Sequence, residues 1–406
     1  MSTVRKTHPR MFGLIAFSFG VPSGFLLVAF PYLATQGGLT VAQVGTVIGV
    51  ALSANFFRLL WMPVCDIWST LTRWVIAGSV LSALAVLLLA LLPIRPDLIL
   101  AITALAFISQ AASTLPAIAG AGLMALCLND KEKGEASGAW QAGNLFAGGI
   151  GGAASLWCAT HFGVVTGGIA AAAMTMIGLV ALPWIHEPEA QHSALPLASR
   201  LGSIAQDLLL AVRDPRVALF ILAASTPIGV GAASSLWSGI AGEWGASPDR
   251  IALVVGVGAA IASAAGALGY GVVSGRCDRF AAYILTGLFL ALIGIAMAEL
   301  PPSATVFTFG VLAYAAMTGA GYAAYTAVIL QVVGSGAAAT KYTAVNAFGN
   351  LPVAYMAALL GILHDRYSTK IMLLGEAAIS VAALFLIWGL GQAIGWNRRT
   401  AEALSA

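Results

Sequence analysis

Twelve apolar segments, each about 20 residues long and separated by short polar breaks, constrain this chain more than any other feature. One helix needs about 20 apolar residues to cross the roughly 30 Å hydrocarbon core of a bilayer. Only 9% of the residues are charged, whereas soluble domains carry roughly 25%. We therefore predict an all-α membrane protein with twelve transmembrane helices. Numbered in chain order, spans 1 to 12 are expected near residues 11–33, 41–64, 74–93, 98–127, 136–159, 163–185, 216–240, 250–273, 280–300, 303–332, 339–363 and 370–393.

The longest polar interruption divides the spans into two groups of six. Spans 1 and 7 both contain a Pro-x-Gly sequence, at Pro22 and Pro227, and spans 2 and 8 both end near an aspartate, Asp66 and Asp278. Such internal similarity is typical of parallel repeats in membrane proteins. The sequence predicts two pseudo-symmetric six-helix bundles. Their expected bounds are residues 1–185 and 216–406, joined by a cytoplasmic linker over 186–215.

Basic residues collect on one side of the predicted membrane. With the N-terminus in the cytoplasm, fourteen of the 19 lysines and arginines fall on the cytoplasmic side. Four fall on the opposite side, namely Arg95, Arg250, Arg366 and Lys370, and the remaining one, Arg58, lies inside span 2. This asymmetry follows the positive-inside rule. We predict that both termini are cytoplasmic.

Several function classes find no support in the sequence. The four cysteines are widely scattered, and the five histidines lie at termini, in loops or at span ends. No Walker A sequence is present, so ATP cannot drive this chain directly. We expect no enzymatic activity, no cofactor, no metal and no nucleic-acid partner. The expected partners are a small molecule and membrane lipids, and the chain is expected to be a monomer.

Arg58 is a cation inside a membrane-spanning segment. A charged residue at this depth costs at least about 2.5 to 3.5 kcal/mol on insertion scales, and it usually faces a bundle interior or a water-filled cavity. It precedes Asp66 by eight residues, which is about 12 Å along a helix axis. A guanidinium held in a cavity can bind a carboxylate or phosphate through its planar fork. The alternative is a structural role at the membrane surface.

The end of span 2 resembles one branch of the major facilitator superfamily. Arg58, Leu60, Trp61, Pro63 and Asp66 fit a basic residue followed by Leu-Trp-x-Pro-x-x-Asp, a pattern of AmpG-type muropeptide permeases, related acetyl-CoA transporters and some siderophore permeases. The resemblance implies the major facilitator fold in a bacterial inner membrane. It also implies a secondary active transporter that works by alternating access, with proton-coupled import of an anionic small molecule.

Two further segments, 131–149 and 339–352, are similar to the same branch, but span 4 departs from it. The branch often carries acids in span 4, whereas this chain has none between Asp97 and Asp130. This departure weakens the case for a muropeptide relative to a siderophore or a CoA-like anion, and all three stay open as the anionic substrate. An exporter of the same fold is an alternative, and so is a non-transporting sensor or scaffold.

Polar residues at mid-span depth are the candidate substrate ligands. Each of them can instead form hydrogen bonds between helices, which is the commoner role of such residues in membranes. The candidates are Arg58, Gln110, Asn144, Tyr325, Asn346 and Asn350.

Charged residues at span ends are the candidate gate. Asp66 and Asp278 can accept hydrogen bonds from helix N-termini or pair with Arg73 and Arg279, and such contacts would hold the cytoplasmic side closed. The alternative is that they are solvated loop charges. Glu376 is the only other ionisable residue within a span, and it is the candidate for proton coupling, with a structural role as the alternative.

Overall fold

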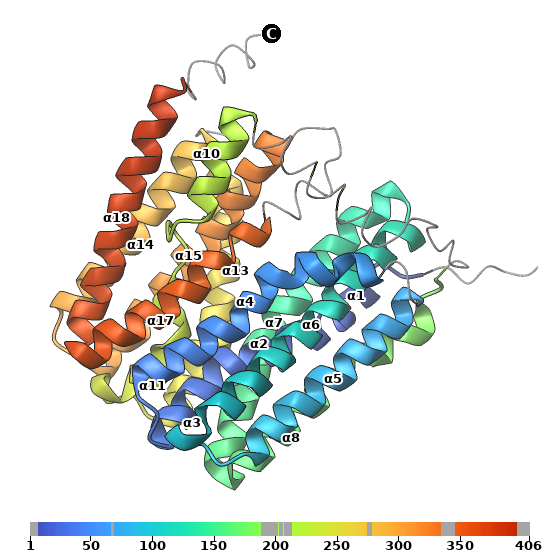
Figure 1. Ribbon diagram of the computed structural model, residues 1–406, viewed down its shortest axis with the longest axis horizontal. Coiled ribbons are helices and arrows are strands. Elements are labelled where there is room, and N and C mark those ends of the chain that lie inside the picture. Colours follow the sequence, from blue (N-terminus) through green and yellow to red (C-terminus); the bar gives the residue numbers. More distant parts are fainter. Residues whose placement is uncertain are drawn as a thin grey trace, which may run out of the picture.

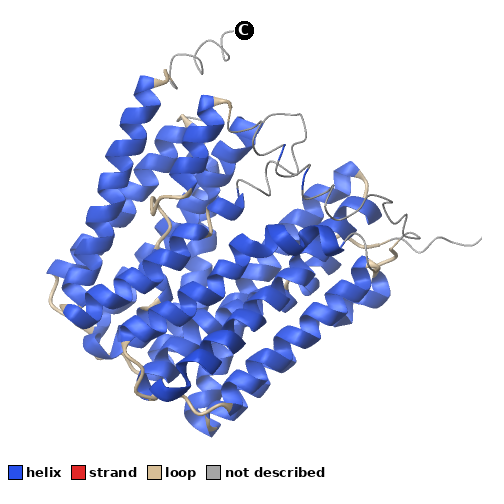
Figure 2. Cartoon of the chain, in the orientation of Figure 1, coloured by secondary structure: helices blue, strands red, loops and turns tan. Residues whose placement is uncertain are grey.

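Helices make up nearly all of the structure, and no strand occurs in the ranges that it describes (Figures 1 and 2). The computed structural model describes residues 7–65, 69–187, 213–273, 278–333 and 346–395, together with positions 202 and 206. Gate residue Asp66 and most of the expected linker lie outside the described residues.

The first half contains spans 1 to 6 in the expected order. Span 1 is divided into three short helices and one π-helical stretch, and Pro22 lies inside the second of these helices. Stretches of π-helix often mark functional sites. The helices are α1 (Met11–Ile15), α2 (Phe17–Gly24), the π-helical Phe25–Ala29, α3 (Phe30–Gln36), α4 (Val41–Cys65), α5 (Leu71–Leu91), the 3-10 turn Pro96–Leu98, α6 (Ile99–Cys127), α7 (Asp130–Phe162), α8 (Val164–Thr175) and the 3-10 segment Met176–Trp184.

The second half repeats this arrangement with a more irregular start. Its first two spans are assembled from short pieces, whereas the later ones are long helices. The elements are α10 (Pro215–Ala224), the 3-10 turn Ala232–Ser235, α11 (Trp237–Ile240), the 3-10 turn Ala241–Trp244, α12 (Pro248–Ile251), the π-helical Ala252–Gly258, α13 (Ala259–Val273), α14 (Arg279–Glu299), α15 (Ala304–Val333), α17 (Leu351–Arg366) and α18 (Thr369–Ala393).

Ten helical stretches are long and apolar enough to cross a bilayer, judged by length and composition of the described residues. The other two expected positions are occupied by α7, whose first turns are charged, and by the divided seventh span. The prediction of an all-α membrane protein is therefore confirmed.

The start of α7 lies six residues before the start expected from apolarity. Asn129 accepts a hydrogen bond from the backbone N–H of Glu132 (3.0 Å), and the Glu132 carboxylate accepts one from the N–H of Asn129 (3.2 Å). This capping box satisfies backbone donors that a helix start leaves free. It begins a helix in a polar stretch that apolarity alone assigns to a loop.

The two halves touch mainly at one end, which we call the joined end. It contains the connections at residues 37–40, 163, 245–247 and 367–368, and α4 packs there against α17 while α7 packs against the 252–258 stretch. A Cβ on Gly45 would collide with the carbonyl oxygen of Ala357, so the α4 and α17 backbones meet closely. Towards the opposite end, the divergent end, the ribbons of the halves separate (Figure 1).

Candidate functional site

A cavity of about 370 Å³ lies between the two halves. Its walls come from α2 and the adjoining π-helical stretch, α7, the seventh span, the start of the eighth span and α15. The volume falls within the roughly 300–1,000 Å³ of small-molecule sites. The lining residues are Gly20, Ser23, Gly24, Leu27, Val28, Asn144, Leu145, Gly148, Gly149, Ser234, Trp237, Val255, Gly256, Ala259, Ala260, Ser263, Val311, Tyr314, Ala315, Thr318 and Tyr322.

The cavity wall is small, aromatic and hydroxylic. On α15, Tyr314, Thr318 and Tyr322 recur at helical spacing, so that one face of this helix forms a wall. None of the described residues that line this cavity is Asp, Glu, Lys, Arg or His. The wall therefore offers a ligand hydrogen bonds from hydroxyl and amide groups, together with aromatic surface.

The seventh span, expected as one helix over 216–240, is interrupted at its centre. Helix α10 ends at Ala224, and helical structure resumes only at Ala232. Gly229 and Gly231 both have a φ of 66°, a left-handed conformation that glycine adopts without the steric cost paid by other residues. The interruption occurs beside the cavity, and Ser234 and Trp237, just beyond it, line the wall.

Side chains from three other helices bond the carbonyl groups at this interruption. Carbonyl groups left unpaired within a membrane cost several kcal/mol each, so an interrupted helix needs such partners. The donors are the Ser380 hydroxyl of α18 to Pro227 O (3.1 Å), the Tyr283 hydroxyl of α14 to Ile228 O (3.1 Å) and the Tyr355 hydroxyl of α17 to Ser225 O (3.0 Å).

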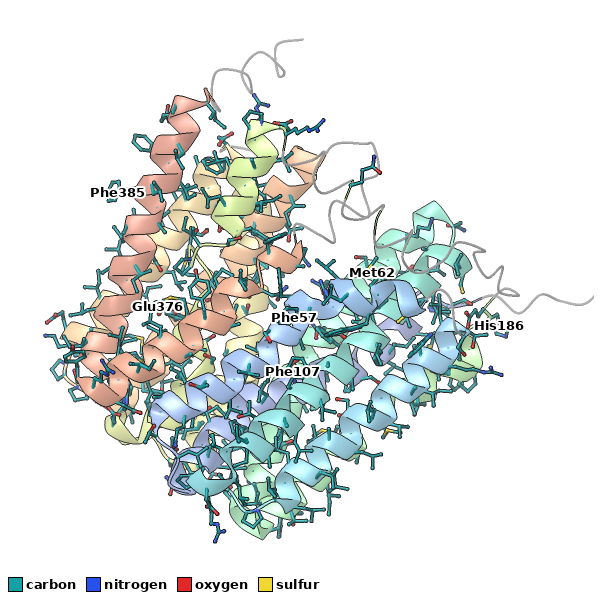
Figure 3. All side chains as sticks on the ribbon, in the orientation of Figure 1. Phe57, Met62, Phe107, His186, Glu376 and Phe385 are labelled. Atoms are coloured by element: carbon teal, nitrogen blue, oxygen red, sulfur yellow. The ribbon has the colours of Figure 1, made fainter. Side chains whose placement is uncertain are left out.

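Glu376 connects α18 to the interruption and to the cavity wall. Its side chain is buried within the second half (Figure 3), whereas Phe385 of the same helix is exposed. One carboxylate oxygen accepts the backbone N–H of Ala233 (3.0 Å), and the other accepts the hydroxyl of Tyr314 (2.7 Å). Because Tyr314 lines the cavity, Glu376 lies directly behind the wall.

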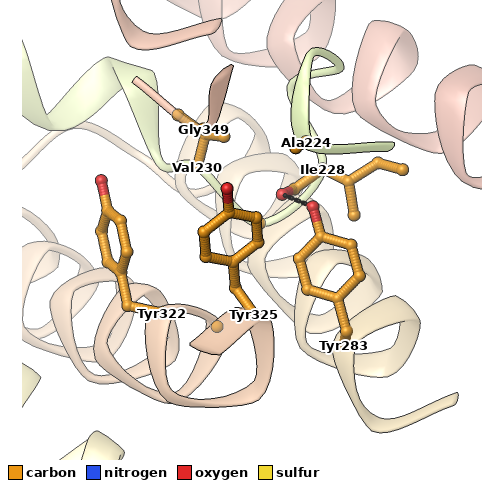
Figure 4. A pocket seen from close by; sticks show the side chains of 9 residues that line it. Ala224, Ile228, Val230, Tyr283, Tyr322, Tyr325 and Gly349 are labelled. Atoms are coloured by element: carbon orange, nitrogen blue, oxygen red, sulfur yellow. Dashed lines mark hydrogen bonds between the residues drawn. The ribbon is translucent and has the colours of Figure 1, made fainter. Parts of the chain in front are cut away.

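A smaller pocket adjoins the interruption and is lined by three tyrosines, Tyr283, Tyr322 and Tyr325 (Figure 4). Tyr322 also lines the central cavity, so its ring stands between the two spaces. The Tyr283 and Tyr325 rings lie 6.0 Å apart between centroids, and the Tyr325 ring lies 5.3 Å from that of Phe220. This aromatic group belongs to the core of the second half.

The candidate substrate ligands occupy different places. Asn144 lines the central cavity. Gln110 is buried behind the wall and accepts a hydrogen bond from the Ser23 hydroxyl (3.1 Å), which does line it. Tyr325 lines the smaller pocket.

Arg58, Asn346 and Asn350 line neither space. Arg58 is half-buried on α4, and the Asn350 side chain donates to the carbonyl of Asn346 (3.1 Å) at the start of α17. The structure thus groups Asn144 and Gln110 at the cavity, and it leaves Arg58 outside its lining.

Three of the four candidate gate residues are described, and they lie at the divergent end. Asp278 is exposed and caps α14 by accepting the N–H of Ala281 (2.9 Å). Arg279 is exposed, and so is Arg73 at the start of α5. Asp66 itself lies outside the described residues.

Sequence reasoning did not identify several residues of the cavity wall. Ser23, Trp237, Ser263 and Thr318 line the cavity, but single hydroxyl or aromatic residues are common in membrane helices. A pattern that could have identified them is the helical spacing of small residues on one face, as in residues 255, 256, 259, 260 and 263.

Among the described residues, no group of three or more His, Cys, Asp or Glu could hold a metal.

The fold and the site define an integral membrane protein of the transporter class. Residues 12–236, more than half of the chain, match the family model of the Major Facilitator Superfamily, and the chain belongs to that family. Members of this class are transporters and not enzymes. None of the curated proteins compared with the chain matches its sequence.

Solved transporters share the fold over nearly the whole chain. A point mutant of the nucleoside transporter NupG has a TM-score of 0.70 at 14% identity, covering 94% of this chain and 98% of that one. The D-xylose-proton symporter gives 0.71 at 14%, with 94% and 96% covered. A bacterial homolog of the human lysosomal transporter Spinster, in an inward-facing and unoccupied conformation, gives 0.65 at 15%, also with 94% and 96% covered. These likenesses establish the major facilitator fold.

Proposed function

We propose that this protein is a secondary active transporter that imports a small molecule by alternating access, with proton coupling, in a bacterial inner membrane. The observation that carries the proposal is the cavity between the two halves, with the buried Glu376 bonded to its wall residue Tyr314. The two halves rock about this cavity, so that it opens to each side of the membrane in turn. Membership of the permease branch that shares the Arg58-to-Asp66 pattern is part of the same proposal.

We place the divergent end in the cytoplasm, which makes the described conformation inward-facing. The support is the positive-inside rule, because the sequence assigns fourteen of the 19 basic residues to the cytoplasmic side, and the described ones among them, such as Arg73 and Arg279, lie at the divergent end. Both termini are cytoplasmic in this orientation. Substrate that entered from outside would leave the cavity towards the cytoplasm.

Glu376 is the proposed coupling residue. Its two hydrogen-bond donors belong to the interrupted seventh span and to the cavity wall, so a change in its charge would alter the hydrogen bonds to both. Protonation removes the charge that the short helix start and the Tyr314 hydroxyl stabilise. A proton taken up there would therefore loosen the contact between α18 and the interruption, and would link the proton to the conformational change.

The sequence favours an anionic substrate, such as a muropeptide, a siderophore or a CoA-like molecule, held by Arg58. The cavity wall favours a second candidate, an uncharged molecule rich in hydroxyl groups. Its support is the absence of charged residues from the described lining and the presence of Ser23, Asn144 and Thr318. The fold likeness to transporters of a nucleoside and of D-xylose makes these two ligands natural members of a test panel.

The test begins with a thermal-shift screen of the purified protein against ferric siderophores, anionic metabolites, nucleosides and pentoses. The stabilising compound is then followed into proteoliposomes with and without an imposed proton gradient. Accumulation driven by the gradient is expected for the natural chain. Glu376→Gln is expected to lose gradient-driven accumulation, while exchange of internal for external substrate persists.

The matched control is Glu299→Gln, the same substitution at an exposed carboxylate of α14. It should accumulate substrate as the natural chain does. Uptake that ignores the proton gradient in the natural chain would contradict proton coupling. Full accumulation by Glu376→Gln would show that Glu376 is not the coupling residue.

A further inference from the structure

A carboxylate of the second half caps a helix of the first half at the joined end. Asp365, near the end of α17, accepts the backbone N–H of Val41 on one oxygen (3.1 Å) and that of Ala42 on the other (2.8 Å). These are the first two residues of α4, whose N–H groups have no partner within the helix. The contact joins residues more than 320 positions apart and crosses the boundary between the halves.

Two further side chains hold Asp365 in place. The ring of His364 lies between two carboxylates, with Nδ1 3.1 Å from Asp365 Oδ1 and Nε2 2.6 Å from Glu243 Oε1. Glu243, in the turn after α11, also accepts the hydroxyl of Thr369 at the start of α18. Because ionised carboxylates only accept hydrogen bonds, a protonated imidazole satisfies both of its neighbours.

The charges of this cluster suit its position. Burial raises the pKa of Glu243, but the hydrogen bonds from His364 and Thr369 outweigh burial and hold that pKa below its usual range. The Glu243 carboxylate is thus ionised at neutral pH. The negative Asp365 carboxylate faces the N-terminus of α4, the positive end of the helix dipole.

We propose that Asp365, positioned by His364 and Glu243, is a lock that holds the joined end closed in the described conformation. Opening this end must pull α4 away from α17, because these helices pack together there. Both backbone donors of α4 then lose their acceptor, and each oxygen of Asp365 loses the N–H that it accepts, while the contact of Asp365 with His364 stays within the second half. The inference rests on the proposed alternating access, and it assigns the lock to residues that the sequence had not marked.

Distance measurements between spin labels across the joined end test the lock without any substrate. Single cysteines replace the exposed Gln36 of the first half and Tyr367 of the second half, in a background with the four natural cysteines changed to serine. Asp365→Asn keeps one acceptor oxygen and loses the other together with the charge, so it is expected to raise the ratio of long to short distances by roughly two- to tenfold, the size of one lost hydrogen bond. Glu243→Gln should shift the ratio in the same direction but less.

Asp97→Asn is the matched control, since this exposed aspartate pairs with Arg95 (2.9 Å) within the first half of the chain. It should reproduce the distances of the natural chain. Equal distance distributions in Asp365→Asn and the control, with both the short and the long distance present, would overturn the lock. If Asp365→Asn fails to fold, an unchanged ratio in Glu243→Gln overturns it. A single short distance in every variant, including when detergent and pH are varied, would instead contradict alternating access.

Discussion

At the residue scale, the charged and polar side chains within the membrane have sharply different surroundings. Glu376 is buried and bonded to a backbone N–H and a tyrosine hydroxyl, while Arg58 is half-buried on α4 and outside the cavity lining. Asn144 is the predicted ligand that the cavity exposes directly. Contact with Arg58 would therefore indicate an anionic substrate, whereas Asn144 can bind a substrate of either class.

Substitution of these two residues separates the substrate classes. Asn144→Ala is expected to raise KM about three- to tenfold for either class, because one hydrogen bond to the ligand is worth about 0.5–1.5 kcal/mol. Arg58→Ala should raise KM more than tenfold for an anionic substrate, since a bond to a charged group is worth about 1.5–3 kcal/mol. Initial uptake rates in proteoliposomes measure both.

Arg58→Lys is the control that keeps the charge and loses the planar fork. Its KM should fall between those of the natural chain and Arg58→Ala when the substrate is anionic. A KM that stays at the natural value in both Arg58 variants would leave only the uncharged substrate class.

At the element scale, the interrupted seventh span is what shapes the wall of the second half. Its glycines permit a backbone that other residues resist, and side chains of α14, α17 and α18 bond the carbonyls that the interruption frees. The π-helical stretches Phe25–Ala29 and Ala252–Gly258 also adjoin the cavity, on spans 1 and 8. These three irregular stretches of backbone therefore lie beside the cavity.

Gly231→Ala is expected to destabilise the fold. The left-handed backbone costs about 1–2 kcal/mol with a Cβ, and that Cβ would lie 2.5 Å from the Thr318 hydroxyl on the cavity wall. We expect a lower Tm in detergent, by several degrees, together with weaker ligand-induced stabilisation. Gly242→Ala, which meets no atom within 4 Å and has no positive φ, is the control. Equal Tm values for the two variants would contradict this account.

At the scale of the whole molecule, two bundles meet through small residues at one end. Glycines of α4 and α7 face the backbone and small side chains of α17 and the eighth span, so the halves approach closely there. Close packing of this kind is either complete or lost, since a side chain inserted between two backbones has no room. With the proposed alternating access, the joined end is therefore expected to act as a two-state contact.

A larger side chain at this contact should shift the conformational balance. Gly45→Val places its branches against the Ala357 carbonyl and is expected to favour the state in which the joined end is open. Spin-label distances across that end should lengthen in a majority of molecules. Gly138→Val on α7, where a Cβ meets no atom within 4 Å, brings the same change in helix propensity and should leave the distances unchanged. Unaltered distances in Gly45→Val would show that the contact is not needed for closure.

Helix positions could be predicted from sequence to within a few residues wherever apolarity was continuous. The spans expected at 98–127 and 370–393 are observed as α6, Ile99–Cys127, and α18, Thr369–Ala393. Prediction failed where local hydrogen bonds override apolarity, as at the capping box that begins α7 and the glycines that interrupt the seventh span. Apolar composition reports membrane burial but does not report backbone conformation.

The sequence by itself determined that the chain is a helical membrane protein, because the lengths of apolar segments and the asymmetry of basic residues depend only on local composition, and its resemblance to a transporter superfamily indicated the class. The tertiary structure alone decided which polar groups meet. The contacts of Glu376 with Tyr314 and Ala233, and of Asp365 with Val41 and Ala42, join residues between 62 and 324 positions apart. Such pairs are set by how the bundles pack, and no local pattern in the sequence records that packing.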